Sequence, residues 1–318
     1  MRFIPIDEKK RAKALAFLAP YERFCVSLVE HIRRGGSDSF AIENNASETI
    51  GVISVKSRML LCIPNVRSLQ NDGDFYTSLK AFLSDKKIAC VNGEADASHA
   101  VIKILSELGR KVLHINEYAL MTLSESALKS LQAKRERQAA ESENTQTGNL
   151  RAHQFPIYGR TGGGTADAAE RKAYLQNLHI VKCGTKDADV LMPLQLAYEA
   201  EEVLPPCRTQ NPAVTRKNLE RILKTEYVVA LQNSRGEPAA KANTNAIGLR
   251  WAQIGGVYTA PDYRRKGYAS LLVETLVEKI VASNRLAVLY ARNGNESAEK
   301  AYTALGFTKT GGFTIAYY

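Results

Sequence analysis

The sequence predicts an α/β (α+β) fold in which helices flank a mixed central sheet, and it predicts that this fold occurs twice in tandem. Apolar residues recur at helical and at strand spacings in alternating segments along both halves of the chain. The elements of the two halves follow nearly the same order, and a segment poor in apolar residues separates them. We therefore expect two domains, residues 1–122 and 177–318, joined by a linker over 123–176.

The composition is that of a globular protein, with 318 residues, of which 45% are hydrophobic and 24% are charged. No apolar run reaches the roughly 18 residues of a membrane-spanning helix, and the N-terminal segment lacks the apolar core of a signal peptide. We expect a cytoplasmic protein that does not bind membranes. The five cysteines and five histidines are scattered, without the spacing of a disulfide framework or a metal site. We expect neither disulfides nor a metal ion.

The first half, residues 1–122, begins with two helices. Strands and helices then follow in the order strand, strand, strand, helix, strand, helix, strand. The expected helices are 7–18, 20–34, 74–85 and 98–109, and the expected strands are 40–44, 50–55, 59–64, 87–92 and 111–123.

The segment between the halves is rich in Ser, Asn, Gln and charged residues, as in a chain that buries little surface. Its run Gly162-Gly163-Gly164 could be taken for a phosphate-binding loop. No Lys-Ser or Lys-Thr pair follows this run, however, and no predicted strand precedes it. We therefore predict a flexible linker over 123–176.

The second half, residues 177–318, repeats the order of the first after one additional strand. A strand pair is expected over 239–260, with its turn near Asn243 to Asn245. The last predicted helix of each half ends in Leu-Gly, at Gly109 and Gly306, which supports two copies of one fold. The other expected strands are 177–184, 227–232, 286–292 and 313–318, and the expected helices are 186–204, 211–227, 270–284 and 295–306.

A basic run, Arg264-Arg265-Lys266, stands directly between a predicted strand and a predicted helix. Gly267 would let the backbone approach a ligand closely, and the small Ala269 would leave the helix start uncrowded. The amides of residues 265–270 would then point outward at a helix N-terminus, where the dipole favours an anion. The net charge of +10 also allows a nucleic-acid surface, but no nucleic-acid-binding motif is evident. We predict a phosphate cradle and no specific nucleic acid.

The same run carries a family resemblance. Arg264-x-x-Gly267-x-Ala269 resembles the Arg/Gln-x-x-Gly-x-Gly/Ala loop with which the GNAT superfamily of acyl-CoA-dependent N-acyltransferases grips the pyrophosphate of coenzyme A. A second block, "LYARNGNESAEKAYTALGF", resembles the next strand and helix of that superfamily. The resemblance covers residues 177–318. It implies an N-acetyltransferase that uses acetyl-CoA as cosubstrate and acts on a small-molecule or peptide amine.

The resemblance also implies roles for individual residues. The strand before the loop would bind the pantetheine arm and polarise the thioester through the backbone of Val257, Tyr258 and Thr259, after a bulge at Gly255-Gly256. The pyrophosphate would be held by Arg264, Arg265, Lys266, Gly267, Tyr268, Ala269 and Ser270. Asn295 would cap the late helix and bind the CoA arm. Tyr302 would be the general acid that protonates the departing thiolate.

The general base is left open by the sequence. Glu199 and Glu202 lie three residues apart, hence on one face of a helix that borders the acceptor site in the family. Glu202 is the candidate base, with Tyr198 and Glu199 on the substrate side, and a solvated helix end is the alternative. Trp251 and Gln253 are further candidates for lining the pocket.

The first half lacks an Arg-x-x-Gly-x-Gly/Ala loop after its third predicted strand, and Leu105 or Val101 stands opposite Tyr302, depending on the alignment. We expect a degenerate GNAT-like domain that packs against the second half and closes the acceptor site. A CoA-binding regulatory or scaffold protein without catalysis is the alternative function, which the retention of Tyr302 disfavours. The sequence leaves a homodimer open.

Overall fold

The computed structural model describes residues 1–69, 72–124, 126–130, 133, 178–206, 208–233 and 235–318. The predicted linker over 123–176, with its run of three glycines, lies almost wholly outside these residues. In the part of the chain that the structure describes, no helix has the length and apolar character needed to cross a membrane.

The first half contains the predicted elements in the predicted order, with one additional strand, β1 (Arg2–Pro5), at its start. The helix predicted over 20–34 is a 3-10 helix, η1 (Ala19–Phe24), followed by α2 (Val26–Arg33), because Cys25 leaves helical geometry between them. The other elements are α1 (Glu8–Leu18), β2 (Ser39–Glu43), β3 (Thr49–Val55), β4 (Arg58–Cys62), α3 (Val66–Leu69), α4 (Gly73–Leu83), β5 (Cys90–Glu94), α5 (Ala95–Glu107) and β6 (His114–Leu123).

The second half differs from prediction in its longest strands. The turn predicted near Asn243 to Asn245 is wrong, because β9 (Pro238–Ile247) runs through these residues. The chain reverses at residues 248–250, before β10 (Trp251–Thr259). The remaining elements are β7 (Leu178–Lys182), η2 (Thr185–Asp187), α8 (Ala188–Tyr198), η3 (Glu199–Val203), α9 (Pro212–Thr225), β8 (Val228–Asn233), η4 (Pro261–Tyr263), α10 (Tyr268–Ala282), β11 (Leu286–Arg292), α11 (Glu296–Ala304) and β12 (Phe307–Tyr317).

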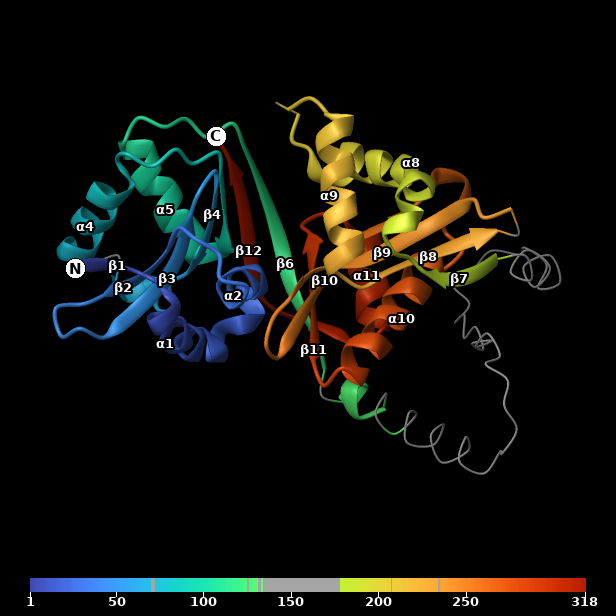
Figure 1. The fold of residues 1–318 in the computed structure, drawn as a ribbon, viewed down its shortest axis with the longest axis horizontal. Helices are drawn as coiled ribbons and strands as arrows, with labels where there is room; N and C mark the ends of the chain where they lie inside the picture. The colour runs from blue at the N-terminus through green and yellow to red at the C-terminus, as the bar shows by residue number, and fades with distance from the viewer. Residues whose placement is uncertain (70–71, 125, 131–132, 134–177, 207, 234) are drawn as a thin grey trace.

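The strands that the structure describes form one mixed sheet of twelve, in the order β1-β2-β3-β4-β5-β12-β6-β11-β10-β9-β8-β7. β12, the last strand of the second half, pairs with β5, whereas β6, the last strand of the first half, pairs with β11. β6 and β12 also pair antiparallel with each other and cross the middle of the molecule side by side (Figure 1). The last strand of each half therefore completes the sheet of the other half.

Each half has a core that includes side chains from the exchanged strand. In the first half, residues of α4 and α5 such as Phe75 pack together with Ala316 of β12. In the second half, Leu272 of α10 packs in a cluster that includes Ala119 and Met121 of β6. The domain boundary at residue 122 stays a prediction. In the structure β6, the last strand before this boundary, pairs with β11 of the second half.

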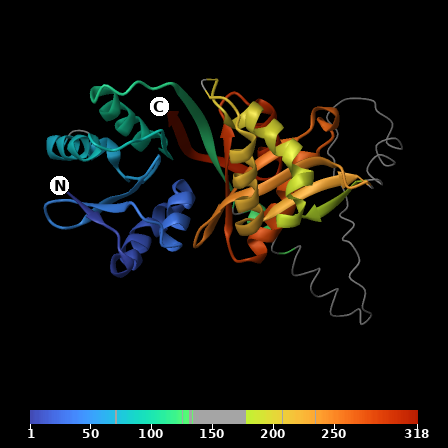
Figure 2. The same ribbon diagram turned by 45° about the horizontal axis from the view of Figure 1, so that its top comes forward.

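Helices cover both faces of the second-half sheet (Figures 1 and 2). Successive residues of β8 point to opposite faces of the sheet, as the two-residue period of a strand requires. Val229 and Leu231 belong to the cluster around α10, whereas Val228 and Ala230 pack with residues of α8 and α9. The face with α8 also meets α2 of the first half, through the residues that form the candidate site.

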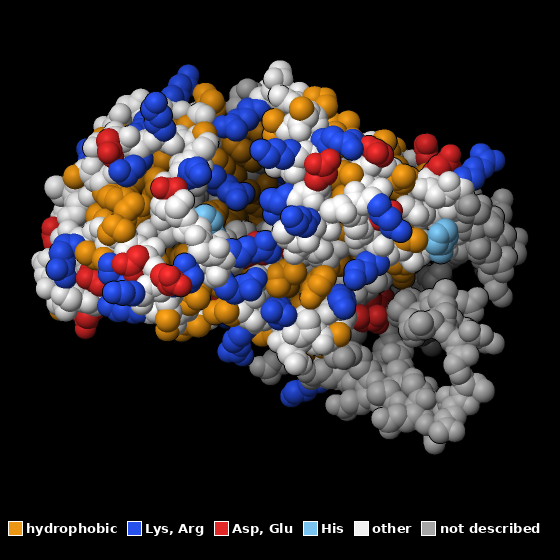
Figure 3. Space-filling model, viewed as in Figure 1, with side chains coloured by type: hydrophobic (Ala, Val, Ile, Leu, Met, Phe, Trp, Pro, Cys, Tyr) orange, Lys and Arg blue, Asp and Glu red, His pale blue; other side chains and the backbone are white. Residues whose placement is uncertain are grey.

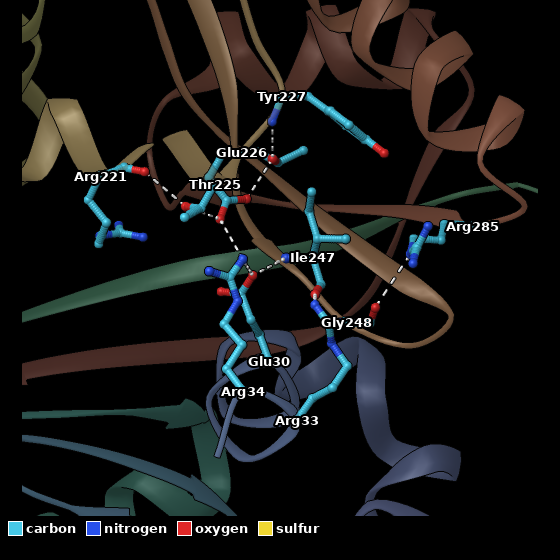
Figure 4. Close-up of polar contacts among 11 residues, drawn as sticks. Glu30, Arg33, Arg34, Arg221, Thr225, Glu226, Tyr227, Ile247, Gly248 and Arg285 are labelled. Atoms are coloured by element: carbon cyan, nitrogen blue, oxygen red, sulfur yellow. Dashed lines mark hydrogen bonds and ion pairs between the residues drawn. The ribbon is translucent and has the colours of Figure 1, made fainter. Parts of the chain in front are cut away.

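The two halves are joined by polar contacts between α2 and the turn that connects β9 to β10 (Figure 4). Glu30 accepts a hydrogen bond from the Ile247 backbone N–H at 3.1 Å and pairs with Arg34 at 2.8 Å. Arg33 donates to the Ile247 carbonyl at 3.2 Å. Burial, together with the nearby Glu30 carboxylate, raises the pKa of Glu226, which lies 3.7 Å from Arg34. These contacts fix the orientation of α2 against the second half.

The carboxylate of Glu22, in η1, lies fully buried beneath the same turn. It accepts hydrogen bonds from the backbone N–H groups of Leu249 at 2.6 Å, Arg250 at 3.1 Å and Trp251 at 3.2 Å. A buried carboxylate needs such donors in place of water. Glu22 therefore connects the turn of the second half to the first half.

Replacing Glu22 with alanine is expected to lower the free energy of unfolding by about 2 to 4 kcal/mol, because buried backbone donors lose a charged acceptor. Urea unfolding followed by circular dichroism measures the change. Glu8→Ala, at an exposed position of α1, is the matched control and should change the free energy by less than about 0.5 kcal/mol. Equal losses in the two variants would contradict the role given to Glu22.

Candidate active site

The loop between η4 and α10 has the geometry of an anion cradle. Arg265 and Gly267 have positive φ angles of 62° and 81°, and Gly267 is the N-cap residue of α10. A Cβ atom added at Gly267 would meet no atom within 4 Å, so the space above this backbone is open. Glycine adopts such a φ angle without strain, and the N-terminus of a long helix favours a phosphate. The loop over residues 264–267 thus has room for an anion such as a phosphate, and we call it the phosphate loop.

Arg264 is fixed by contacts with its neighbours. Its Nε donates to the Thr259 carbonyl at 3.0 Å, and its Nη2 donates to Glu201 at 2.6 Å. The Tyr258 hydroxyl donates to the same carboxylate at 2.5 Å. The hydrogen bond from Tyr258, and then that from Arg264, lower the pKa of Glu201. Arg264 therefore ties the loop to η3 and β10. Glu201 was not predicted as the partner of Arg264.

At the centre of the site, β10 stops pairing with β11 and forms a bulge against β9. It pairs with β11 from Trp251 to Ile254, and this pairing ends there although both strands continue. On the other side, its pairing with β9 skips Gly256 and Val257, which confirms the predicted bulge. Gly256 has a φ of 58°, and a Cβ atom there would collide with Asn243. The separated strands leave room for an extended arm to bind along β10.

Lys241 lies behind this bulge and was not predicted as a site residue. It is 1% exposed, and its Nζ donates to the Gly256 carbonyl at 3.0 Å and to Asn243 at 3.3 Å. The amine also lies 4.8 Å from the ring centroid of Tyr198. Burial lowers the pKa of Lys241 to about 7. The sequence did hold a signal, since Lys241, Asn243 and Asn245 alternate with other residues and so share one face of β9.

The free energy of unfolding is expected to rise between pH 7 and 10.5 relative to that of a Lys241→Met variant. In this window the unfolded lysine binds a proton and the folded lysine does not, so higher pH favours folding by up to about 1.4 kcal/mol per pH unit. Below pH 7 both states bind the proton and the difference should become constant. Urea unfolding of both proteins at pH 6, 7, 8 and 9 measures the trend. A difference that does not vary with pH would contradict it.

Tyr302 and Asn295 come from α11. Burial, and then the nearby Glu202 carboxylate, raise the pKa of Tyr302 to about 12, so the phenol keeps its proton at neutral pH. Its ring packs edge-to-face on Phe307, with centroids 6.4 Å apart. Asn295 accepts a hydrogen bond from the Ala298 backbone N–H at 3.1 Å, which confirms its predicted capping role.

The end of α8 is a π-helical turn, η3, which carries the predicted acceptor-side glutamates. The helical spacing predicted one face for both glutamates, but in the wider turn only Glu199 accepts hydrogen bonds from other described residues. Glu199 accepts hydrogen bonds from Thr215 of α9 and from Gln195, the latter at 3.0 Å. Glu202 is half-buried; burial raises its pKa, and Arg292 opposes the shift. A carboxylate of raised pKa beside Tyr302 is a candidate for proton transfer.

One cavity of about 1510 Å³ brings these groups together. Every predicted site residue lines it except Lys266, whose Nζ donates to the Asp262 carbonyl at 3.2 Å. Gln253 also lines it, as predicted, whereas Trp251 does not. Residues of α2 and β4 form the opposite wall, so the first half encloses the site. No group of three or more His, Cys, Asp or Glu side chains among the described residues could hold a metal ion.

The corresponding helix start in the first half is closed to an anion. The Asp72 carboxylate caps α4 and accepts hydrogen bonds from the N–H groups of Asp74 at 2.9 Å and Phe75 at 3.3 Å. An acidic cap at this place repels phosphate. Val101 and Leu105, opposite Tyr302 in the two alignments, are fully buried in the core. The first half thus lacks both the open cradle and the tyrosine.

Comparisons with known proteins agree with this geometry. Residues 235–314 match the family model described as FR47-like protein, and no curated protein matches the chain in sequence. A Drosophila protein of solved structure has a TM-score of 0.62 at 10% identity, over 99% of this chain and 98% of that one. A tandem GNAT protein from the clavulanic acid biosynthesis pathway has a TM-score of 0.55 at 13% identity, over 99% and 98%. The chain has the tandem GNAT fold.

A GNAT-family acetyltransferase from Colwellia psychrerythraea is similar over the full length of both chains, with a TM-score of 0.52 and 10% identity. The resemblance predicted from the loop and the late helix is therefore confirmed for the fold. Within the tandem GNAT fold, the FR47-like match extends from before β9 into β12. That segment contains the bulge, the phosphate loop and Tyr302.

Proposed function

We propose that this tandem GNAT protein is an N-acetyltransferase that transfers the acetyl group of acetyl-CoA to an amine by direct attack. The observation that carries the proposal is that the phosphate loop, the bulged strand β10 and Tyr302 all line one cavity. The loop holds the pyrophosphate through the amides at the start of α10. The pantetheine arm lies along β10, which brings the thioester to the bulge at Gly256.

The amine nitrogen attacks the carbonyl carbon of the thioester, so that a C–N bond forms and the C–S bond breaks. Backbone N–H groups of β10 near Val257 and Tyr258 stabilise the negative charge that develops on the carbonyl oxygen. Tyr302 gives its hydroxyl proton to the departing sulfur. The amine loses a proton to Glu202, directly or through water, and this proton balances the one that Tyr302 has given up.

Lys241 acts as a positioning residue in this proposal. Its hydrogen bond to the Gly256 carbonyl, at 3.0 Å, holds the backbone of the bulge in place. Rigid placement of the neighbouring amides matters because groups that stabilise a transition state must not reorganise during the reaction. Lys241 itself does not line the cavity, so it is not a candidate base.

The test is to incubate the purified protein with acetyl-CoA and a panel of amines and to measure the release of free thiol. We expect thiol release that depends on at least one amine, and mass spectrometry should detect the acetylated form of that amine. Saturable acetyl-CoA binding without amine-dependent thiol release, over a panel of amino acids, polyamines, amino sugars and peptides, would instead indicate a CoA-binding regulatory or scaffold protein.

A further inference from the structure

The acceptor side of the cavity is built by both halves and is rich in arginine. The first half contributes Arg58 at the start of β4, the segment after η3 contributes Arg208, and the end of β11 contributes Arg292. Figure 3 shows Lys and Arg side chains gathered around the hollow between the halves. Three guanidinium groups from distant parts of the sequence thus meet one cavity.

The hydrogen bonds of Arg208 and Arg292 go to uncharged groups. Arg208 donates to the Ala89 carbonyl at 3.1 Å and lies 5.5 Å from the ring centroid of Tyr317. Arg292 donates to the Asn116 side-chain oxygen at 2.9 Å. These partners orient the guanidinium groups but carry no negative charge. Among the described residues, no carboxylate lies within 4.0 Å of Arg58, Arg208 or Arg292.

The glutamates that line the cavity are mostly engaged elsewhere. Glu30 pairs with Arg34, and Glu201 pairs with Arg264. Glu199 accepts hydrogen bonds from Thr215 and Gln195. Glu202 has neither a hydrogen bond nor an ion pair with another described residue, and it lies beside Tyr302. The cavity therefore offers one carboxylate near the reacting centre and several cations farther along its wall.

Cys90 and Tyr118 connect the arginines into one region. Arg58 is the register partner of Cys90 in the pairing of β4 with β5. Arg208 donates to the carbonyl of Ala89, the residue before Cys90. Burial raises the pKa of the Cys90 thiol to about 11, and both arginines oppose this shift. Burial likewise raises the pKa of Tyr118, on which Arg292, Glu202 and Cys90 also act. Glu202, Arg292, Arg58 and Arg208 therefore all line the part of the cavity around Cys90 and Tyr118.

We infer that the acceptor is an amine that carries an anionic group, a carboxylate or a phosphate, at the end remote from the reacting nitrogen. This inference rests on the proposed function. The anionic end binds Arg58 and Arg208, whose guanidinium groups suit planar carboxylates and phosphates. The amine end reaches Glu202 and the bulge of β10. A polyamine would bring a second ammonium group to the arginines and is disfavoured by repulsion.

The test compares pairs of acceptors that differ in the anionic group: amino acids with their carboxamides, and aminoethyl phosphate with ethanolamine. Wild-type kcat/KM is expected to be at least about 10-fold higher for the anionic member of the better pair. The kcat/KM values of the two anionic acceptors, compared with each other, identify whether the site takes a carboxylate or a phosphate. Equal rates within both pairs, or turnover of polyamines alone, would overturn the inference while leaving the proposed acetyl transfer intact.

Variants locate the anion. Arg58→Gln and Arg208→Gln should each lower kcat/KM for the anionic acceptor by about 10- to 100-fold and leave that for its neutral partner unchanged. Arg235→Gln, at an exposed turn outside the cavity, is the control and should change neither. Equal losses with both acceptors would refute the assignment of these arginines.

A binding measurement separates the inference from the proposed function. In the presence of CoA, calorimetric titration with the amino acids and with aminoethyl phosphate should show binding that Arg58→Gln weakens and Arg235→Gln does not. If no amine releases thiol but this binding is found, the acetyl transfer fails and the anion site stands. If no anionic amine binds, the anion site fails.

Discussion

A Tyr302→Phe variant is expected to retain wild-type affinity for acetyl-CoA and to lose about 10²- to 10⁴-fold in kcat, the range for removal of a general acid. The substitution removes one oxygen and keeps the ring, so the packing on Phe307 is preserved. The rate of thiol release at saturating acceptor measures kcat, and calorimetry measures the affinity for acetyl-CoA. Tyr227→Phe, outside the cavity, is the matched control.

The pH dependence of the same pair sharpens this expectation. Since burial raises the pKa of Tyr302 to about 12, the acid form is present throughout the neutral range and is lost only as the pH rises through that value. Between pH 7 and 9, deprotonation of Tyr302 should therefore not lower the wild-type kcat. A decline of kcat in this range that is seen in the wild type and absent from Tyr302→Phe is not expected. Such a decline, or a variant with unchanged kcat, would exclude Tyr302 as the acid.

Residues 178–318 expressed alone are expected to be insoluble or unfolded, and they should fold when coexpressed with residues 1–133. The fragment lacks β6, which pairs with β11 on one side and with β12 on the other. Its loss would expose two strand edges and remove Ala119 and Met121 from the core of the second half. Copurification of the two fragments, followed by size-exclusion chromatography and circular dichroism, measures the assembly.

A matched pair of strand variants tests the cause. Met121→Asp in residues 1–133 should prevent coassembly, because it places a charge in the shared core where Met121 is 1% exposed. Lys111→Asp, at an exposed position before β6, should not. A soluble monomer of residues 178–318 that unfolds cooperatively would show instead that the second half folds without the exchanged strand.

Much of the site was predictable because its chemistry lies in two short segments. The loop at 264–270 takes its shape from the local conformations of Arg265 and Gly267 and from the helix that follows. Tyr302 follows Asn295 on one helix, so a single motif positions both. The acceptor side had no such motif. Arg58 and Arg208 come from separate parts of the chain that only the folded structure brings to the same cavity, and Lys241 reaches the bulge of β10 from the neighbouring strand β9.

The sequence by itself determined the order of helices and strands, the repeated architecture and the cradle at the start of α10. These follow from the periodicity of apolar residues and from glycine at a backbone position with positive φ. The tertiary structure alone decided which strands pair. The alternation in β6 and β12 specifies two faces and no particular neighbour, because the backbone groups that join strands are the same in every residue. The exchange of the two strands, and the cavity that it helps to enclose, therefore depend on the packing of the whole chain.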